Sequence, residues 1–180
     1  EEIPVSTRFP AVDPQGLLEY SVVFTDRSLN HMSKTFQHVM LDVSSTLKRV
    51  YSADAVVVVP GGGTFGMEAV ARQLATGRRA MVLRNGFFSY RWSQIFEAGS
   101  IPASSTVLSA RMVREGSKAP FAPVPIDEVV EAIARERPEV FFAPHVETSS
   151  GIMLPTDYMR AIADAVHEAG GLFVLDCIAS

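Results

Sequence analysis

Residues 56–70 read VVVVPGGGTFGMEAV, and this stretch decides which fold the sequence predicts. Four valines lead through Pro60 and three glycines into a pattern with helical spacing. A run of β-branched residues is typical of a strand buried on both faces, so we expect a strand over residues 55–59. Glycines between a strand and a helix let the backbone approach a ligand closely. The stretch therefore predicts a binding turn in an α/β protein.

Strand and helix patterns alternate along the rest of the chain. Apolar residues at three- and four-residue spacing predict helices, and short apolar runs predict strands. The predicted helices cover residues 33–51, 64–76, 89–98, 126–137 and 155–169, and the predicted strands cover residues 80–83, 106–108, 140–143 and 172–175. Residues 115–125 contain three prolines and are expected to form a loop. This order predicts an α/β fold with a mainly parallel sheet flanked by helices.

Composition is that of a globular protein and argues against several classes of partner. The chain has 180 residues, of which 47% are hydrophobic, and a formal net charge of −4. This charge provides no field that attracts nucleic acid, and no apolar run has the length of a membrane span. One cysteine, and four histidines without metal-ligand spacing, predict neither an intrachain disulfide nor a metal site. The cytoplasm is the expected location.

The two ends of the chain lead to different expectations. Residues 1–30 show no regular period, so we expect an irregular N-terminal segment. Residues 31–180 are expected to form the N-terminal part of one larger domain. The last predicted strand is followed closely by Ser180, and a core strand at the very end of a domain would lack cover. We therefore expect the natural polypeptide to continue beyond Ser180.

Polar or glycine-rich segments follow four of the predicted strands. They are residues 61–64, residues 85–88, residues 145–150 and Asp176. The carboxyl ends of parallel strands meet at one edge of a sheet, which is where open α/β proteins bind ligands. The sequence thus predicts a binding site at this edge.

The glycine turn admits a dinucleotide as one ligand. Gly61, Gly63 and Gly66 satisfy the G-x-G-x-x-G fingerprint. The next predicted strand, however, is followed by Arg84 instead of the acid that holds a ribose hydroxyl, although an arginine suits a ribose phosphate. A P-loop is excluded because no Gly-Lys-Ser/Thr follows the glycines.

A single phosphate is the simpler interpretation. The amides of Gly62, Gly63 and Thr64 would point at an anion from a helix N-terminus. Asp176 follows four apolar residues, so its carboxylate is expected to be partly buried and to meet a cation or good donors; an N-cap is the alternative role. With Phe88 as a stacking aromatic, these residues fit pyridoxal phosphate, whose protonated ring nitrogen pairs with a carboxylate.

Four segments occur in a fixed order: PGGGTFGMEAV, RNGFFSYRW, APHVETSSGI and LFVLDCIAS. Together they resemble the class V aminotransferases of pyridoxal-phosphate fold type I, in particular the alanine–glyoxylate and the serine–glyoxylate or serine–pyruvate aminotransferases. The resemblance covers nearly the whole chain. It implies that six residues bind the cofactor: Gly62, Gly63, Thr64, Phe88, Thr148 and Asp176. The aromatic would stack on the ring, the hydroxyl of Thr148 would bond to the cofactor, and Asp176 would be the catalytic partner of the pyridinium nitrogen.

The resemblance also implies an activity for the intact protein. This activity is transamination between an amino acid, such as alanine or serine, and a 2-oxo acid, such as glyoxylate or pyruvate, in a homodimer. The family's Schiff-base lysine follows the aspartate, whereas Lys34, Lys48 and Lys118 all precede Asp176. This chain alone is therefore expected to be inactive. Arg91 matches a position inside the fold, and a structural role is expected for it.

Three alternative functions remain open at this point, one of which is a non-catalytic domain that only binds a partner. A lyase or desulfurase of the same fold type would keep the cofactor and change the reaction. A dinucleotide-binding domain would use Gly61, Gly63 and Gly66 instead.

Overall fold

The structure is a computed structural model that describes residue 31 and residues 34–180. Its contacts divide the chain into two compact units, residues 1–59 and residues 60–180. The irregular segment predicted for residues 1–30, and its boundary, lie outside the described residues. None of the helices in the described part has both the length and the apolar character needed to cross a membrane.

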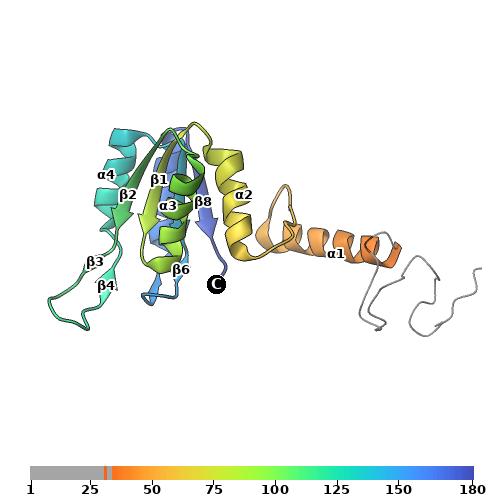
Figure 1. Ribbon diagram of the computed structural model, residues 1–180, viewed down its shortest axis with the longest axis horizontal. Helices are drawn as coiled ribbons and strands as arrows, with labels where there is room; N and C mark the ends of the chain where they lie inside the picture. Colours follow the sequence, from red (N-terminus) through yellow and green to blue (C-terminus); the bar gives the residue numbers. More distant parts are fainter. Residues whose placement is uncertain (1–30, 32–33) are drawn as a thin grey trace, which may run out of the picture. The chain divides into compact units, whose positions relative to one another are not determined.

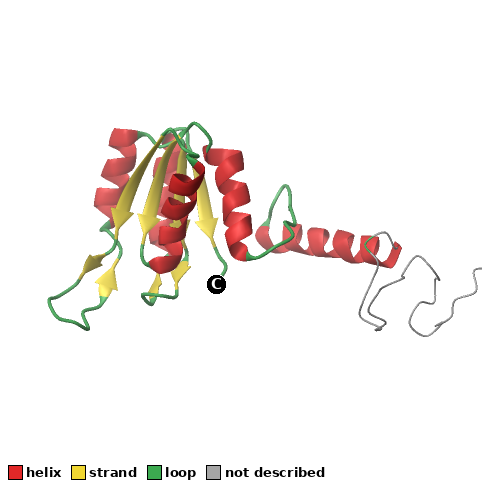
Figure 2. Ribbon diagram, viewed as in Figure 1, coloured by secondary structure: helices red, strands yellow, loops and turns green. Residues whose placement is uncertain are grey.

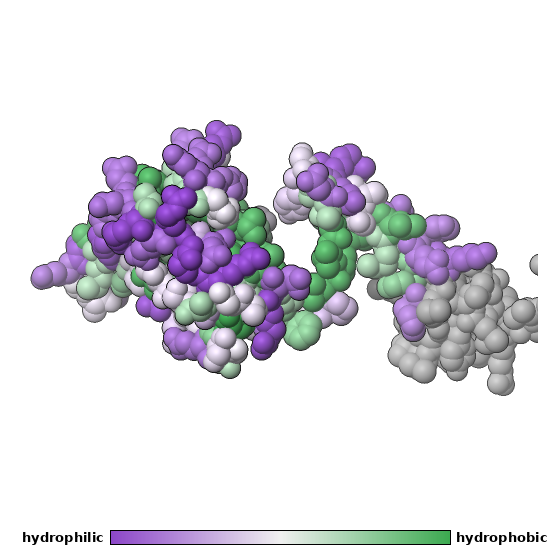
Figure 3. Space-filling view, turned by 90° about the horizontal axis from the view of Figure 1, so that it is seen from above, coloured by the Kyte–Doolittle hydropathy of each residue, from purple (hydrophilic) through white to green (hydrophobic). Residues whose placement is uncertain are grey.

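The first unit contains the helix α1 (Lys34–Tyr51), as predicted (Figure 1). The strand predicted over residues 55–59 is wrong, because these residues form no strand. Val57 is 82% exposed. Figure 3 shows hydrophobic residues, coloured green, at the surface of the described part. A strand requires a neighbour that pairs with its backbone amides and carbonyls, and residues 55–59 pair with no described segment. Apolar, β-branched composition alone does not supply that partner.

The second unit is built on a four-stranded parallel sheet (Figure 2). In spatial order its strands are β2 (Ser104–Ser109), β1 (Arg79–Arg84), β5 (Val140–Pro144) and β8 (Leu172–Asp176). Every residue of β5 is buried, as expected for a central strand covered on both faces. The predicted parallel sheet is confirmed.

Helices cover both faces of this sheet. They are α2 (Gly63–Ala75), α3 (Phe87–Gly99), α4 (Ile126–Glu136) and α5 (Thr156–Glu168). All four were predicted, with ends that differ by at most two residues. Side chains of α2 and α3 share one core with one face of the sheet, and those of α4 and α5 share a second core with the other face.

Alternation along the strands separates the two cores. Val82 and Phe142 point to the α2–α3 side, whereas Met81 and Phe141 point to the α4–α5 side. On the first side, the ring of Phe142 lies 4.6 Å from that of Trp92, centroid to centroid. This aromatic packing fixes α3 against the sheet.

Two short antiparallel pairs extend from the sheet. The strands β3 (Arg111–Met112) and β4 (Phe121–Ala122) form one pair, and β6 (Val146–Glu147) and β7 (Ile152–Met153) form the other. The loop predicted over residues 115–125 is therefore wrong in part, since it contains β4. Two-residue strands are too short for an alternating pattern to reveal them.

Candidate active site

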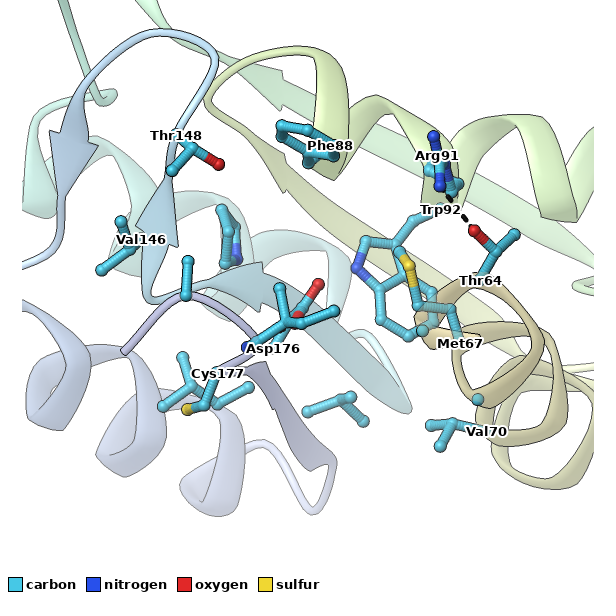
Figure 4. A pocket seen from close by; sticks show the side chains of 17 residues that line it. Thr64, Met67, Val70, Phe88, Arg91, Trp92, Val146, Thr148, Asp176 and Cys177 are labelled. Carbon is cyan, nitrogen blue, oxygen red and sulfur yellow. Dashed lines mark hydrogen bonds between the residues drawn. The ribbon is translucent and has the colours of Figure 1, made fainter. Parts of the chain in front are cut away.

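A cavity of about 570 Å³ lies within the second unit, at the carboxyl end of β5 and β8 (Figure 4). It is lined by residues of α2, α3, the loop after β5 and the end of β8. Five of the six predicted cofactor-binding residues line it: Gly63, Thr64, Phe88, Thr148 and Asp176. Gly62 precedes this set as the N-cap of α2 and is not part of the lining. The described residues that line the cavity include no lysine.

The N-terminus of α2 brings free backbone donors to the cavity. The amides of Gly62, Gly63 and Thr64 have no acceptor within the described part of the chain, and the first turn of α2 has no acidic residue. Gly61 has a φ of 136°, a conformation that favours glycine. A Cβ on Gly63 would lie 2.6 Å from Ile178 Cδ1. The turn is therefore shaped by glycine and presents unpaired N–H groups.

The first turns of α3 form one wall of the cavity. Phe88 is 42% exposed, so a large part of its ring is available to a ligand. The guanidinium of Arg91 lies 5.9 Å from the centroid of this ring, and Arg91 Nη1 donates a hydrogen bond to Thr64 Oγ1. Trp92 is buried beneath them, and its Nε1 has no acceptor among the residues that the structure describes.

Asp176 lies at the last position of β8. The parallel pairing of β5 and β8 places it beside Pro144, and its carbonyl accepts a hydrogen bond of 2.8 Å from the amide of His145. Its Oδ1 accepts only the Ile178 amide, at 3.1 Å, a bond typical of an aspartate in a turn. No cation pairs with this half-buried carboxylate in residues 34–180. The cavity thus holds a carboxylate that still has free lone pairs.

Glu147 is a residue of this region that the sequence analysis did not select. Its side chain is fully buried next to Thr148. The carboxylate accepts four hydrogen bonds: from the amides of Phe88 and Ser89, at 3.1 and 2.8 Å, and from the hydroxyls of Ser89 and Ser149, at 2.6 and 2.5 Å. It therefore joins the start of α3, which carries the exposed ring, to the loop that carries Thr148.

Burial and hydrogen bonding act in opposite directions on Glu147. Burial raises the pKa of the carboxyl, whereas the bonds from Ser149, Ser89 and Phe88 lower it. Together the bonds prevail, and the pKa of Glu147 lies below its ordinary value. The positive end of the α3 dipole favours the same ionised state.

The arrangement is suited to a ligand with charges of opposite sign at its two ends. Free amides and Thr64 form an anion-binding end, and the carboxylate of Asp176 forms a cation-binding end (Figure 4). Between them lie apolar walls and the exposed face of Phe88, as is usual for cofactor sites.

Comparison with known proteins gives relatives for most of the chain. No family model matches it. Alanine–glyoxylate aminotransferase of Rattus norvegicus is 27% identical over 157 residues, which are 86% of this chain and 35% of the relative. L-aspartate–glyoxylate aminotransferase of Paracoccus denitrificans (strain Pd 1222) is 25% identical over 154 residues, 82% of this chain and 36% of the relative.

A solved structure supports the same relationship. The aspartate aminotransferase of subgroup IV from Thermus thermophilus superposes with a TM-score of 0.67 and 25% identity, over 85% of this chain and 40% of that one. The chain spans about a third of the length of the curated relatives it matches. In sequence and in fold the chain matches part of a class V aminotransferase of fold type I, which confirms the resemblance that the four motifs indicated.

Proposed function

We propose that this chain is the cofactor-binding part of a pyridoxal-phosphate-dependent aminotransferase. One observation carries the proposal: the free amides at the start of α2 and the free lone pairs of Asp176 lie at the same cavity. Pyridoxal phosphate has a matching anionic phosphate and cationic ring nitrogen. The similarity to two glyoxylate aminotransferases supports the same assignment.

Each predicted residue then has a task. Gly62, Gly63 and Thr64 would bind the phosphate through N–H and O–H donors. Phe88 would hold the ring by stacking, and Thr148 would orient it through a hydrogen bond. Asp176 would keep the ring nitrogen protonated by ion pairing. When bound, the cofactor supplies an electron sink for the bonding electrons released at the α-carbon of an amino acid.

The substrates of the intact protein are inferred from the relatives. We propose amino transfer from a small amino acid, alanine or serine, to a 2-oxo acid, glyoxylate or pyruvate. The reaction requires a lysine amine, and none of Lys34, Lys48 and Lys118 lies in the cavity lining. We therefore propose that this chain alone binds the cofactor without transaminating, and that the functional protein is a cytoplasmic homodimer.

Cofactor binding can be tested with the chain itself. Trp92 is the only tryptophan and lines the cavity, so its fluorescence reports on occupancy. Pyridoxamine 5′-phosphate should quench it, and Asp176→Asn should weaken binding about tenfold, because the ion pair with the ring nitrogen is lost. Binding of NADH in place of the pyridoxamine compound would instead favour a dinucleotide site. Amino transfer from alanine to glyoxylate by this chain would overturn the requirement for a further lysine.

A further inference from the structure

Arg91 is an arginine of the second unit that pairs with no carboxylate in the described part of the chain, although it lies beside the anion-binding end of the cavity. The ion pairs of the described residues use other arginines: Arg72, Arg79, Arg111 and Arg135. Arg91 is half-buried, and its guanidinium lies 5.9 Å from the ring centroids of both Phe87 and Phe88. Its Nη1 donates to Thr64 Oγ1. A structural role alone does not explain why this cation faces a hydroxyl in the cavity.

The hydrogen bond has a consequence for Thr64. A guanidinium only donates, so Arg91 must occupy a lone pair of the threonine oxygen. The hydroxyl hydrogen is then left to point elsewhere, and no acceptor for it exists among the described residues. Because Thr64 is exposed and lines the cavity, this hydrogen is available to an anion bound there.

Charge leads to the same conclusion. The start of α2 contributes the equivalent of about half a positive charge from its dipole. A phosphate monoester carries a charge of about −1.5 to −2 near neutral pH, which the dipole alone does not balance. The guanidinium of Arg91 donates a hydrogen bond to Thr64 and is, among the residues that the structure describes, the one cationic group that lines this cavity.

We propose that Arg91 is a positioning residue for phosphate: it fixes Thr64 as a donor to the cofactor's phosphate and supplies the balancing positive charge. The inference rests on the proposed function and deepens it. It also changes the structural role that the sequence predicted for Arg91 into a functional one.

The chain offers a matched control in Arg84. Arg84 Nη2 donates to Ser109 Oγ at 3.2 Å, and its guanidinium lies 5.2 Å from the ring centroid of Tyr90. This is the same combination of hydroxyl and aromatic contacts that Arg91 makes. Arg84, however, lines a different cavity, away from Thr64. An effect that is specific to phosphate should therefore appear only at Arg91.

The test measures preference for the phosphate group instead of affinity alone. Pyridoxamine 5′-phosphate and pyridoxamine differ only in the phosphate, so the ratio of their Kd values, read from Trp92 fluorescence, isolates its contribution. Arg91→Gln should reduce this ratio about tenfold, the loss expected for one charge-assisted contact. Arg91→Lys, which keeps the charge, should retain most of the preference, and Arg84→Gln should leave it unchanged.

Circular dichroism shows whether Arg91→Gln folds. If it does not fold, variants of Thr64 test the same connection between Arg91, Thr64 and the phosphate. Thr64→Val removes the hydroxyl at nearly constant shape and should also lower the ratio about tenfold, whereas Thr64→Ser should keep it. A ratio unchanged in Arg91→Gln or in Thr64→Val, or lowered equally in Arg84→Gln, would overturn the inference and leave the proposed function standing. A wild-type chain with no preference for the phosphorylated compound would overturn the proposed function, and this inference with it.

Discussion

The helices α2 and α3 lie in the same unit, but their first backbone amides differ: those of α3 are hydrogen-bonded, and those of α2 are unpaired. At α3, the five backbone amides of residues 85–89 all donate to side-chain oxygens, which belong to Ser89, Glu147 and Ser149. At α2, the three amides of residues 62–64 have no acceptor in the described chain. Both helices begin after a glycine, Gly62 or Gly86, that provides no side-chain cap.

The difference separates a helix end whose first amides are hydrogen-bonded inside the protein from one whose first amides stay open. A buried helix end requires acceptors for its first amides, and Glu147 provides an ionised one from inside the protein. The start of α2 is exposed, so its first amides need no acceptor from within the protein and would be free to bind the proposed anion. The α3 end holds one wall of the cavity in place, whereas the amides at the α2 end remain unpaired beside the cavity.

The largest expected effect comes from removing the internal acceptor at α3. Glu147→Gln keeps the size of the side chain but replaces one oxygen by an NH₂ group, which faces donors. We expect the free energy of unfolding to fall by about 3 kcal/mol, since buried donors lose a charged acceptor. Urea denaturation measures this loss. Glu128→Gln, at an exposed carboxylate, serves as the control and should show no resolvable change. Equal stability of the two variants would mean that the α3 end does not depend on Glu147.

The next largest effect tests how closely the α3 end is packed. A Cβ on Gly86 would lie 2.4 Å from Ser149 Oγ and 2.7 Å from Glu147 Cγ. Gly86→Ala should therefore lower the free energy of unfolding by about 2 kcal/mol through overpacking. Thermal unfolding followed by circular dichroism measures it. An unchanged free energy of unfolding would show that the loop carrying Ser149 moves aside at little cost.

Acidic pH should weaken the α3 end and leave the α2 end unaffected. The pKa of Glu147 is lowered in the folded protein, below the value of about 4.3 for an unperturbed glutamate. Its stabilising contribution is therefore complete above that value and is lost as the pH falls through the folded pKa. Between pH 6 and pH 3.5, the wild type should lose more unfolding free energy than Glu147→Gln. Parallel losses would contradict this assignment.

The smallest effect, of opposite sign, is expected at α2. A Cβ on Gly66 would meet nothing within 4 Å, and Gly66 lies inside the helix. Gly66→Ala should raise the free energy of unfolding by about 0.5 to 1 kcal/mol, through helix propensity. The same denaturation experiment measures the gain. If Gly66→Ala lowered the free energy of unfolding as much as Gly86→Ala, the contrast between the two helix ends would be removed.

The fold was predictable wherever local pattern and tertiary environment agree. Helical spacing predicted α4 and α5 because their apolar sides pack on one face of the sheet. Continuous apolar runs predicted β1 and β5 because these strands are covered on both faces. The same rule is wrong for residues 55–59, which have the composition of a buried strand but no partner strand in the described chain. A strand is a property of a pair, and one segment does not contain that information.

The site was predictable in part for a related reason. Thr64, Phe88, Thr148 and Asp176 were expected to meet because they follow strand ends or match a family motif, and all four line the cavity. Glu147 was not selected, because its partners at the start of α3 lie 58 and 59 residues away in sequence. Hydrogen bonds over such separations leave no local pattern in a single sequence.

Because side chains alternate along β1 and β5, the sheet divides the interior of the second unit into two separate hydrophobic cores. Side chains such as Met81 and Phe141 pack with α4 and α5, whereas Val82 and Phe142 pack in the core that contains Trp92, which lines the cavity. Repacking Met81 and Phe141 therefore offers a route to a more stable protein in which the core around Trp92 is unchanged. Inserting a single residue early in β5 would turn its later side chains to the opposite faces of the sheet and disrupt both cores at once.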